Sequence, residues 1–314
     1  MPPVRFVTIV TPEFWPGFAA LVQSLTENAG LGEGGFELVA ICDETLAPRT
    51  WLDSRAERIS IFPLSDLPKI ELLSAQNQGA RMENALQKLG VFALPEDWGK
   101  CIFIDSDVVC LGSLCGLGGF PALTAAPDMP MMEADLPTDP LADPEFEYNT
   151  GLFVFEPSAR IFAELQEVYR LRHHERTHKG DQDVFNLWVR ERGVAVHLLG
   201  SEWNFAKRYQ DFLGRRWIAD RMDRIKTMHF VGVKPWTNNR EVTTFRECHY
   251  RGLEEIWWDF FERSGFAPHM ANPPRRAQAF VRQCVLPVAS PAIVKEHCIR
   301  LVRLFRKRVL GHKA

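Results

Sequence analysis

The segment CIFIDSDVVCLGSL, residues 101–114, places two aspartates directly after a short apolar run. Residues 101–107 are predicted to form one buried strand, with an apolar run at 101–104 and with Asp105 and Asp107 at its carboxyl end. Side chains two positions apart on an extended backbone point to the same side, so these carboxylates are expected to converge. Carboxylates that close repel each other unless a cation lies between them, and hard oxygen ligands suit Mg²⁺ or Mn²⁺. In the alternative interpretation, Asp105 caps the next turn and Asp107 is solvated.

The rest of the first 110 residues alternates between apolar runs and helical patterns. Runs at 4–11, 36–44 and 58–64 predict buried strands, while residues 14–30 and 77–94 have helical spacing. Strands that alternate with helices favour a parallel sheet covered on both faces. Such sheets bind ligands at the carboxyl ends of their strands, which is where the two aspartates stand.

The pattern changes after residue 120, where a stretch rich in proline and acidic residues precedes further apolar runs and helical patterns. Asp181 is predicted to be the N-cap of one of the later helices. In chain order the predicted elements are an exposed excursion at 128–147, a strand at 150–157, helices at 158–178 and 181–193, short strands at 194–199 and 227–232, and a helix at 254–265.

The composition is that of a globular protein with ample material for a core, since 46% of the 314 residues are hydrophobic and 25% are charged. The seven cysteines fit no zinc spacing, and we interpret them as reduced thiols. The first residues lack the pattern of a signal peptide, and no apolar run approaches the roughly 18 residues of a membrane-spanning helix. The protein is therefore expected in the cytoplasm.

Basic residues are concentrated at the C-terminal end. Residues 273–314 contain ten Lys/Arg and one Glu, a net charge of +9, while the whole chain has a net charge of −3, so residues 1–272 carry −12. Residues 294–310 have the pattern of a basic amphipathic helix, which favours binding to an anionic membrane surface. The alternative is that its apolar stripe packs on the body. Nucleic acid is not an expected partner, because the basic residues are not interleaved with aromatic ones.

A second distinctive segment, HFVGVKPW, spans residues 229–236. His229 follows a predicted strand and offers an imidazole nitrogen to the same metal as the aspartates. Gly232 lets a backbone amide approach a phosphate closely, and Lys234 supplies a positive charge for that phosphate. Taken singly, such a histidine is more often structural and such a lysine solvated, but their combination at fixed spacing favours a binding site.

Four motifs in the same order resemble glycosyltransferase family eight, the group of glycogenin and the bacterial lipopolysaccharide galactosyl- and glucosyltransferases. They are FIDSD (103–107), YNTGLFVFEPS (148–158), GDQD (180–183) and HFVGVKPW (229–236). The resemblance covers about residues 4–240. It implies the GT-A fold, a Rossmann-like α/β fold with a mixed sheet flanked by helices. We accordingly predict a catalytic domain at 1–262 and a basic helical extension at 263–314.

The resemblance also implies a metal site and a donor site. Asp105, Asp107 and His229 would hold Mn²⁺ or Mg²⁺, and the diphosphate of a UDP-sugar would be neutralised by this metal together with a lysine. Asp181 and Gln182 would line the reacting face near the anomeric carbon. The positions that match donor-binding residues of the family are Ile9, Thr11, Arg81, Asp105, Ser106, Asp128, Asn149, Gly232 and Lys234. The alternative for a single polar residue among them is a cap or a loop hydrogen bond.

The activity implied by the resemblance is retaining transfer of galactose or glucose from a UDP-sugar to a hydroxyl acceptor. The expected acceptor is a saccharide or a lipid-linked glycan of the cell envelope, and the tail would hold the enzyme on the inner face of the cytoplasmic membrane. Retention is compatible with double displacement through Asp181 or with front-face attack, in which the acceptor enters on the side that the phosphate leaves. The resemblance favours the front-face route.

Three other functions compete with this one. A phosphatase of the haloacid dehalogenase type also places D-x-D after a strand, but near the start of the chain, and it leaves HFVGVKPW without a role. A non-catalytic module that binds sugar nucleotides or membranes has no need of an intact metal site. Self-glucosylation, as in glycogenin, needs a reachable tyrosine, and Tyr148, Tyr169, Tyr209 and Tyr250 all stand outside a flexible tail.

Overall fold

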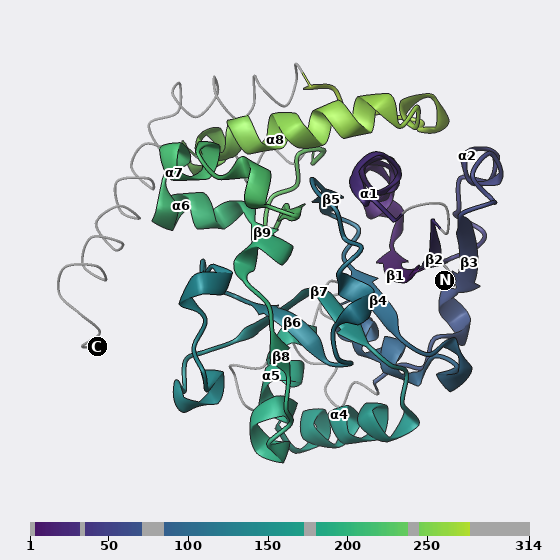
Figure 1. The fold of residues 1–314 in the computed structure, drawn as a ribbon. Helices are drawn as coiled ribbons and strands as arrows, with labels where there is room; N and C mark the ends of the chain where they lie inside the picture. Colours follow the sequence, from purple (N-terminus) through teal and green to yellow (C-terminus); the bar gives the residue numbers. More distant parts are fainter. Residues whose placement is uncertain (1–3, 32–34, 71–84, 173–179, 238–244, 277–314) are drawn as a thin grey trace.

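A seven-stranded sheet runs through the middle of the computed structural model, which describes residues 4–31, 35–70, 85–172, 180–237 and 245–276 (Figure 1). The strand order in this sheet is β3-β2-β1-β4-β7-β6-β8. The bounds are Val4–Val10 for β1, Phe36–Cys42 for β2, Ile59–Pro63 for β3, Cys101–Ile104 for β4, Thr124–Pro127 for β6, Tyr148–Phe155 for β7 and His197–Leu198 for β8.

The sheet is mixed, as the resemblance implied. Strands β3, β2, β1 and β4 are parallel to their neighbours, which confirms the parallel arrangement predicted from the first 110 residues. Strand β7 then runs antiparallel to both β4 and β6, and β8 pairs parallel with β6. The carboxyl ends of the parallel strands therefore meet the amino end of β7 along one edge of the sheet.

The two aspartates lie in a turn, which corrects the prediction of one strand over residues 101–107. Strand β4 ends at Ile104, and the amide of Val108 donates a hydrogen bond to the carbonyl of Asp105 (3.1 Å), so the chain reverses there. After the turn, β5 (Val108–Cys110) joins a second sheet of order β5-β10-β9, with β9 at Phe205–Ala206 and β10 at Thr227–His229. His229 pairs with Val108 in this sheet, so it lies beside the aspartate turn.

Helices cover both faces of the main sheet. In Figure 1, α1 (Trp15–Asn28) and α8 (Phe245–Arg263) lie above the sheet, and α4 (Ala159–Arg172) and α5 (Asp181–Arg192) lie below it. Alternating side chains of each strand divide between the two layers. Phe6, Leu38 and Ile102 belong to the core cluster under α1 and α8, whereas Val7, Val39 and Phe103 belong to the cluster with α4 and α5.

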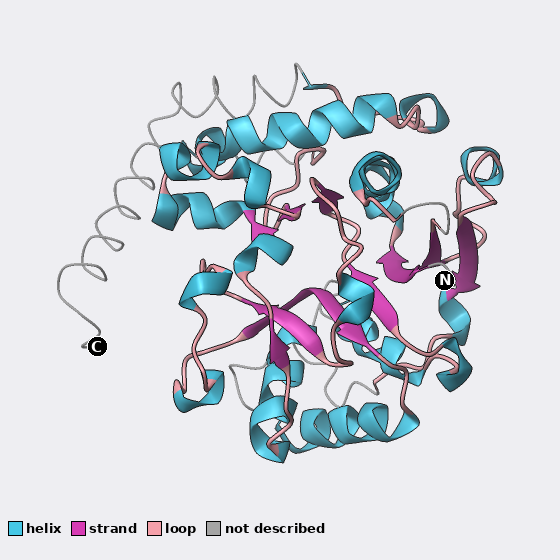
Figure 2. Cartoon of the chain, in the orientation of Figure 1, coloured by secondary structure: helices cyan, strands magenta, loops and turns pink. Residues whose placement is uncertain are grey.

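The remaining helices of the described residues are short, and Figure 2 shows the helices in cyan. The α-helical ones are α2 (Arg49–Asp53), α6 (Gln210–Leu213) and α7 (Arg215–Ala219). The 3₁₀ helices are Pro12–Phe14, Leu64–Asp66, Lys88–Ala93, Glu96–Trp98, Leu117–Gly119, Glu133–Asp135, Pro140–Ala142, Ser201–Trp203, Lys207–Tyr209, Met222–Arg224 and Ala267–His269.

Two predicted helices differ from the structure in detail. Residues 77–84 of the predicted helix at 77–94 lie outside the described residues, and its last part is the 3₁₀ helix Lys88–Ala93. Helix α5 begins at Asp181 with Gly180 as its N-cap, so the prediction that Asp181 caps the helix is wrong by one position. The Asp181 carboxylate instead turns toward the sheet edge, where it contacts other side chains.

Residues past the end of α8 pack against the N-terminal half of the chain. The Trp51 indole donates a hydrogen bond to the Ser264 carbonyl (3.1 Å), and its ring meets Phe266 edge to face at 5.1 Å. Arg263 forms a bidentate pair with Glu27 of α1 at 2.9 and 2.8 Å. The predicted domain boundary at residue 262 stays a prediction, because the basic tail beyond residue 276 lies outside the described residues.

Within the part of the chain that the structure describes, no helix is both long enough and apolar enough to span a bilayer. Cys42, Cys101, Cys110 and Cys115 are free thiols, and the first three are buried. Burial raises the pKa of Cys42 and of Cys101 to about 11, so these thiols are protonated and pack as small apolar groups.

Candidate functional site

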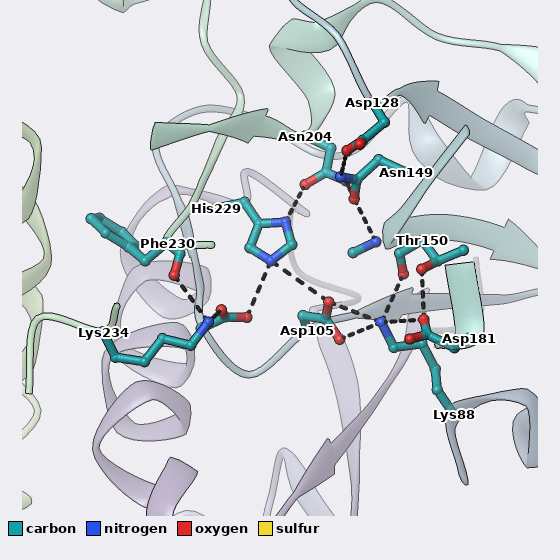
Figure 3. Close-up of polar contacts among 12 residues, drawn as sticks. Lys88, Asp105, Asp128, Asn149, Thr150, Asp181, Asn204, His229, Phe230 and Lys234 are labelled. Carbon is teal, nitrogen blue, oxygen red and sulfur yellow. Dashed lines mark hydrogen bonds and ion pairs between the residues drawn. The ribbon is translucent and has the colours of Figure 1, made fainter. Parts of the chain in front are cut away.

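Asp105, Asp107 and His229 converge at the junction of the two sheets (Figure 3). The Nε2 atom of His229 lies 3.3 Å from Oδ1 of Asp107 and 3.6 Å from Oδ2 of Asp105. One ligand atom from each of the three residues lies within 4.8 Å of the others. Two carboxylates and an imidazole form a donor set that suits Mn²⁺ or Mg²⁺, so the residues fit the metal that the sequence predicted.

A hydrogen-bond chain fixes the orientation of the His229 ring. The Asn204 amide nitrogen donates to Oδ1 of Asn149 (2.7 Å), which leaves the Asn204 carbonyl oxygen facing Nδ1 of His229 at 3.1 Å. Because an oxygen can only accept this hydrogen bond, Nδ1 carries the proton and Nε2 presents its lone pair to the aspartates. Outer partners of this kind set the tautomer of metal-binding histidines.

Gly151 of β7 provides the space for that ring. A Cβ atom at this position would lie 2.2 Å from Cε1 and 2.4 Å from Nδ1 of His229. We expect Gly151→Ala to displace the ring and to weaken Mn²⁺ binding by about 10- to 100-fold, the effect typical of disturbing an outer partner of a metal ligand. Titration of the metal by calorimetry measures this.

The control for this change is Gly252→Ala, because a Cβ atom at Gly252 on α8 meets no atom within 4 Å. The control variant should bind Mn²⁺ as the unchanged protein does. Equal Mn²⁺ affinity of Gly151→Ala and Gly252→Ala would contradict the placement of His229 in the metal site.

Lys234, in the loop after β10, brings a positive charge to the metal triad, which is Asp105, Asp107 and His229. Its ammonium forms an ion pair with Oδ2 of Asp107 and donates to the carbonyl of Phe230 at 3.0 Å. Gly232 has φ of +78°, the left-handed region that favours glycine, and this lets the loop fold back. The Trp236 indole, which donates to the carbonyl of Glu13 (2.9 Å), anchors the far end of the loop.

A buried ion pair contacts the backbone of the same loop. Lys207 and Glu254 are fully buried and lie 2.8 Å apart, and the Lys207 ammonium also donates to the carbonyl of Val233. Lys207 lies on a 3₁₀ helix and Glu254 on α8, so two separate elements hold the backbone next to Lys234.

Lys88 joins the metal site to the start of α5. Its ammonium lies 2.9 Å from Oδ1 of Asp105 and 2.9 Å from Oδ2 of Asp181, and it donates to the carbonyl of Thr150 at 3.3 Å. The Thr150 hydroxyl donates to the same Asp181 oxygen at 2.6 Å. Burial lowers the pKa of Lys88. The charges of Asp105 and Asp181 raise it by more than burial lowers it, so the pKa lies above its ordinary value.

The two aspartates of the triad differ in charge balance. Burial raises the pKa of Asp107, but Lys234 and His229 outweigh it, so the net pKa lies well below its ordinary value. The pKa of Asp105 is raised, first by burial and then by the charge of Asp107, against the opposing pull of Lys88. Lys88 alone therefore does not offset the burial of Asp105 and the charge of Asp107, and a divalent cation between the two carboxylates would supply further positive charge.

Asp128 and Asn149 extend the polar network away from the triad. The Asn149 amide donates to Oδ1 of Asp128 at 2.6 Å, and its own carbonyl oxygen accepts from the Gly151 amide at 2.8 Å. Arg208, which follows β9, forms an ion pair with the same Asp128 oxygen. Asp128 therefore lies at the far end of a hydrogen-bond chain that starts at His229.

The structure brings most of the predicted site residues together. One connected network contains Asp105, Asp107, Asp128, Asn149, Asp181, His229 and Lys234 (Figure 3). The Gln182 side chain contacts Glu147, a carboxylate that lies near Asp128. Ser106 is buried in the aspartate turn, and its carbonyl would lie 2.5 Å from a Cβ atom at Gly17.

Two further predicted donor residues lie near the end of β1. Ile9 is the penultimate residue of strand β1 and has a partly buried side chain, and Thr11 is the N-cap of the following 3₁₀ helix. Arg81 lies outside the described residues. Their predicted roles, like the roles of the other donor residues, stay predictions.

Sequence reasoning missed Lys88, Thr150, Asn204 and Arg208. Lys88 stands seven residues after Arg81, about two helical turns, so a helical reading of 77–94 would have placed both on one face. Thr150 lies inside the motif YNTGLFVFEPS, but nothing in the sequence indicated a role for its hydroxyl. Asn204 and Arg208 follow a short 3₁₀ turn in a region without a recognisable motif, and only tertiary contacts reveal them.

Comparison with known proteins identifies the family. The model of Glycosyl transferase family 8 matches residues 8–240. The putative UDP-glucuronate:xylan alpha-glucuronosyltransferase 4 of Arabidopsis thaliana is 29% identical over 269 residues, which cover 83% of this chain and 42% of that protein. Glycogenin of Komagataella phaffii is 25% identical over 217 residues, covering 64% and 49% of the two chains. This chain thus spans about half, or less, of the length of these curated relatives.

A solved structure confirms the fold. The galactosyltransferase LgtC, in complex with donor and acceptor sugar analogs, superposes with a TM-score of 0.58 at 14% identity, covering 88% of this chain and 100% of that one. The mixed sheet flanked by helices is therefore the GT-A fold that the sequence predicted. Because the family model also spans the aspartate turn and the loop of Lys234, the phosphatase alternative is wrong. The chain belongs to glycosyltransferase family 8.

Proposed function

We propose that this chain transfers a hexose, galactose or glucose, from a UDP-sugar to a hydroxyl acceptor, with metal dependence and with retention of configuration. The observation that carries the proposal is the convergence of Asp105, Asp107 and His229 beside Lys234 and Lys88. Such a cluster is suited to a diphosphate, because it combines a metal donor set with two lysine ammonium groups. The proposed acceptor is a saccharide or a lipid-linked glycan of the cell envelope.

The metal would be Mn²⁺ or Mg²⁺, held by Asp105, Asp107 and His229. When bound, it would supply positive charge to the diphosphate as UDP leaves. Lys234 would exchange its ion pair with Asp107 for one with the same diphosphate, and Gly232 would let the loop backbone approach it. The described arrangement supports this exchange, because Lys234 reaches Asp107 from a loop held in place at both ends.

The nucleoside and the sugar of the donor would contact the predicted donor-binding residues. Ile9, Thr11, Arg81 and Ser106 would contact the nucleoside side of the donor. Asp128 and Asn149, which are joined by a 2.6 Å hydrogen bond, would accept and donate hydrogen bonds to sugar hydroxyls. The Gln182 side chain would complete the reacting face near the acceptor.

The contacts of Asp181 support front-face attack. Its Oδ2 atom accepts from the Thr150 hydroxyl and pairs with Lys88, and both contacts withdraw electron density from the carboxylate. Such a carboxylate is a poor nucleophile but still stabilises positive charge that develops at the anomeric carbon. The acceptor hydroxyl would enter on the side that the phosphate leaves and give its proton to a phosphate oxygen.

The proposed place of action is the cytoplasmic face of a membrane, where lipid-linked acceptors are reached. Two observations support it: the +9 charge of residues 273–314 and the amphipathic pattern of residues 294–310. This segment lies outside the described residues, so the support comes from the sequence alone.

Release of UDP from a panel of donors tests the proposal. The panel contains UDP-galactose, UDP-glucose and UDP-glucuronate, the last because relatives of this chain are named for that donor. We expect UDP release from a neutral hexose donor that stops on chelation of the metal, and an α-linked product from an α-linked donor by NMR. A β-linked product would contradict retention, and chelation-resistant release would contradict the metal site.

A further inference from the structure

Arg208 and Asp128 form an ion pair at the end of the network that begins at the metal triad. The side chains keep 37% and 17% of their exposure, so both are reachable from solvent. Arg208 belongs to the 3₁₀ helix Lys207–Tyr209, and the neighbouring Tyr209 hydroxyl donates to the carbonyl of Pro127 at 2.9 Å. The helix is thus fastened directly beside Asp128, which holds the guanidinium in place.

The position of this pair follows from a short chain of contacts. His229 contacts Asn204 at 3.1 Å, Asn204 donates to Asn149 at 2.7 Å, and Asn149 donates to Asp128 at 2.6 Å. Three hydrogen bonds therefore separate a metal ligand from the Asp128–Arg208 pair. In the proposed function Asp128 contacts the donor sugar, so the Asp128–Arg208 pair would lie beside that sugar.

Carboxylates match or exceed the cations around this subsite. Among the residues that the structure describes there, Lys88 is paired with Asp105 and Asp181, and Arg208 is paired with Asp128. Glu147 adds a further, half-buried carboxylate, and its pKa is raised by burial first and then by the charges of Asp128 and Asp183, against the opposing charge of Arg190. A negative charge on the incoming sugar would meet an environment that is already rich in negative charge.

We propose that the Asp128–Arg208 pair makes the sugar subsite selective for a neutral hexose and against a hexuronate. A hexuronate carries a carboxylate at C6, which would lie against Asp128 unless it displaced Asp128 from Arg208. Like charges brought together at a binding site cost affinity, and such a repulsive element is a common source of specificity. This inference rests on the proposed function, since it takes Asp128 as a residue that contacts the donor sugar.

Reciprocal charge changes at the pair test the inference. The dissociation constants of UDP, UDP-glucose, UDP-galactose and UDP-glucuronate are measured by calorimetry with Mn²⁺, and each donor is compared with UDP, which lacks a sugar. In the unchanged protein we expect UDP-glucuronate to bind at least tenfold more weakly than the better neutral donor. Binding needs no acceptor and no turnover, so variants that lose activity still give a result.

The two single variants should move the preference in opposite directions. Asp128→Asn uncovers the guanidinium and should improve the affinity for UDP-glucuronate, relative to the neutral donors, by about tenfold. Arg208→Gln leaves Asp128 unpaired and should worsen that relative affinity by a similar factor. A role in folding alone would weaken all donors in both variants and would leave the ratio unchanged. Asp223→Asn and Arg224→Gln, exposed residues of the 3₁₀ helix Met222–Arg224, are the matched controls.

Equal or tighter binding of UDP-glucuronate by the unchanged protein would overturn the inference. A shift of the donor ratio in the same direction in Asp128→Asn and Arg208→Gln would overturn it as well. Failure of the proposed function would look different, because UDP itself would then show no metal-dependent binding. That outcome would overturn both, whereas metal-dependent UDP binding with an unmoved donor ratio would overturn this inference alone.

Discussion

Asp107→Asn is expected to lower the rate of UDP release from the donor, as kcat/KM, by about a thousandfold, or about 4 kcal/mol. Asp107 serves two groups at once, because Oδ1 lies 3.3 Å from His229 and Oδ2 pairs with Lys234. The amide keeps the size of the side chain but removes the charge that would hold a divalent cation. UDP release with increasing Mn²⁺ measures the effect, and added metal should recover only a small part of it.

The control for this change is Asp97→Asn, which removes a carboxylate from an exposed position in the 3₁₀ helix Glu96–Trp98. Its rate should equal that of the unchanged protein. A full rate for Asp107→Asn at ordinary Mn²⁺ would show that Asp107 is not a metal ligand and that its ion pair with Lys234 is only structural.

Lys88→Met should lower kcat by about a hundredfold or more while UDP binds nearly as before. The ammonium lies between Asp105 and Asp181, so its loss leaves two close carboxylates without their shared cation. Removing one partner of a buried charge cluster also destabilises the fold, typically by about 3–5 kcal/mol. Steady-state kinetics and a thermal melt of each variant separate the effect on kcat from the loss of stability.

Lys88→Arg and Lys69→Met complete this test. Arginine keeps the charge and should retain much of the stability and part of the rate, although its planar fork differs from a compact ammonium. Lys69 is exposed and should tolerate methionine without an effect on the rate. A folded Lys88→Met protein with normal kcat would remove Lys88 from the account of the reaction.

The amino-acid pattern was sufficient to predict the parallel half of the sheet, because β-branched and apolar runs separated by helices have one common arrangement. It was not sufficient for β7, since an apolar run such as 150–157 carries no information about its direction. The end of β4 was also misplaced. Asp105 continues the extended pattern of residues 101–104 in the sequence, and only the hydrogen bond from Val108 shows that the chain turns there.

Site residues were predictable where a motif supplied the chemistry. Asp105, Asp107, His229 and Lys234 all stand in such motifs, and the structure places them in contact. Lys88 and Arg208 were missed because a lone lysine or arginine on a short helix is usually solvated, and its partner lies far away in the sequence. Asp181 was assigned to a helix cap by local pattern, whereas a tertiary contact with Lys88 determines its orientation.

Calorimetric titration of UDP, with and without Mn²⁺, measures metal-dependent binding and needs neither the correct sugar nor the acceptor. We expect Mn²⁺ to tighten UDP binding at least tenfold in the unchanged protein, or by about 1.4 kcal/mol. Asp107→Asn should abolish this gain and Asp97→Asn should retain it. Two results would contradict a metal site at Asp105, Asp107 and His229. One is equal affinity for UDP with and without the metal, and the other is an Asp107→Asn protein in which Mn²⁺ still tightens UDP binding.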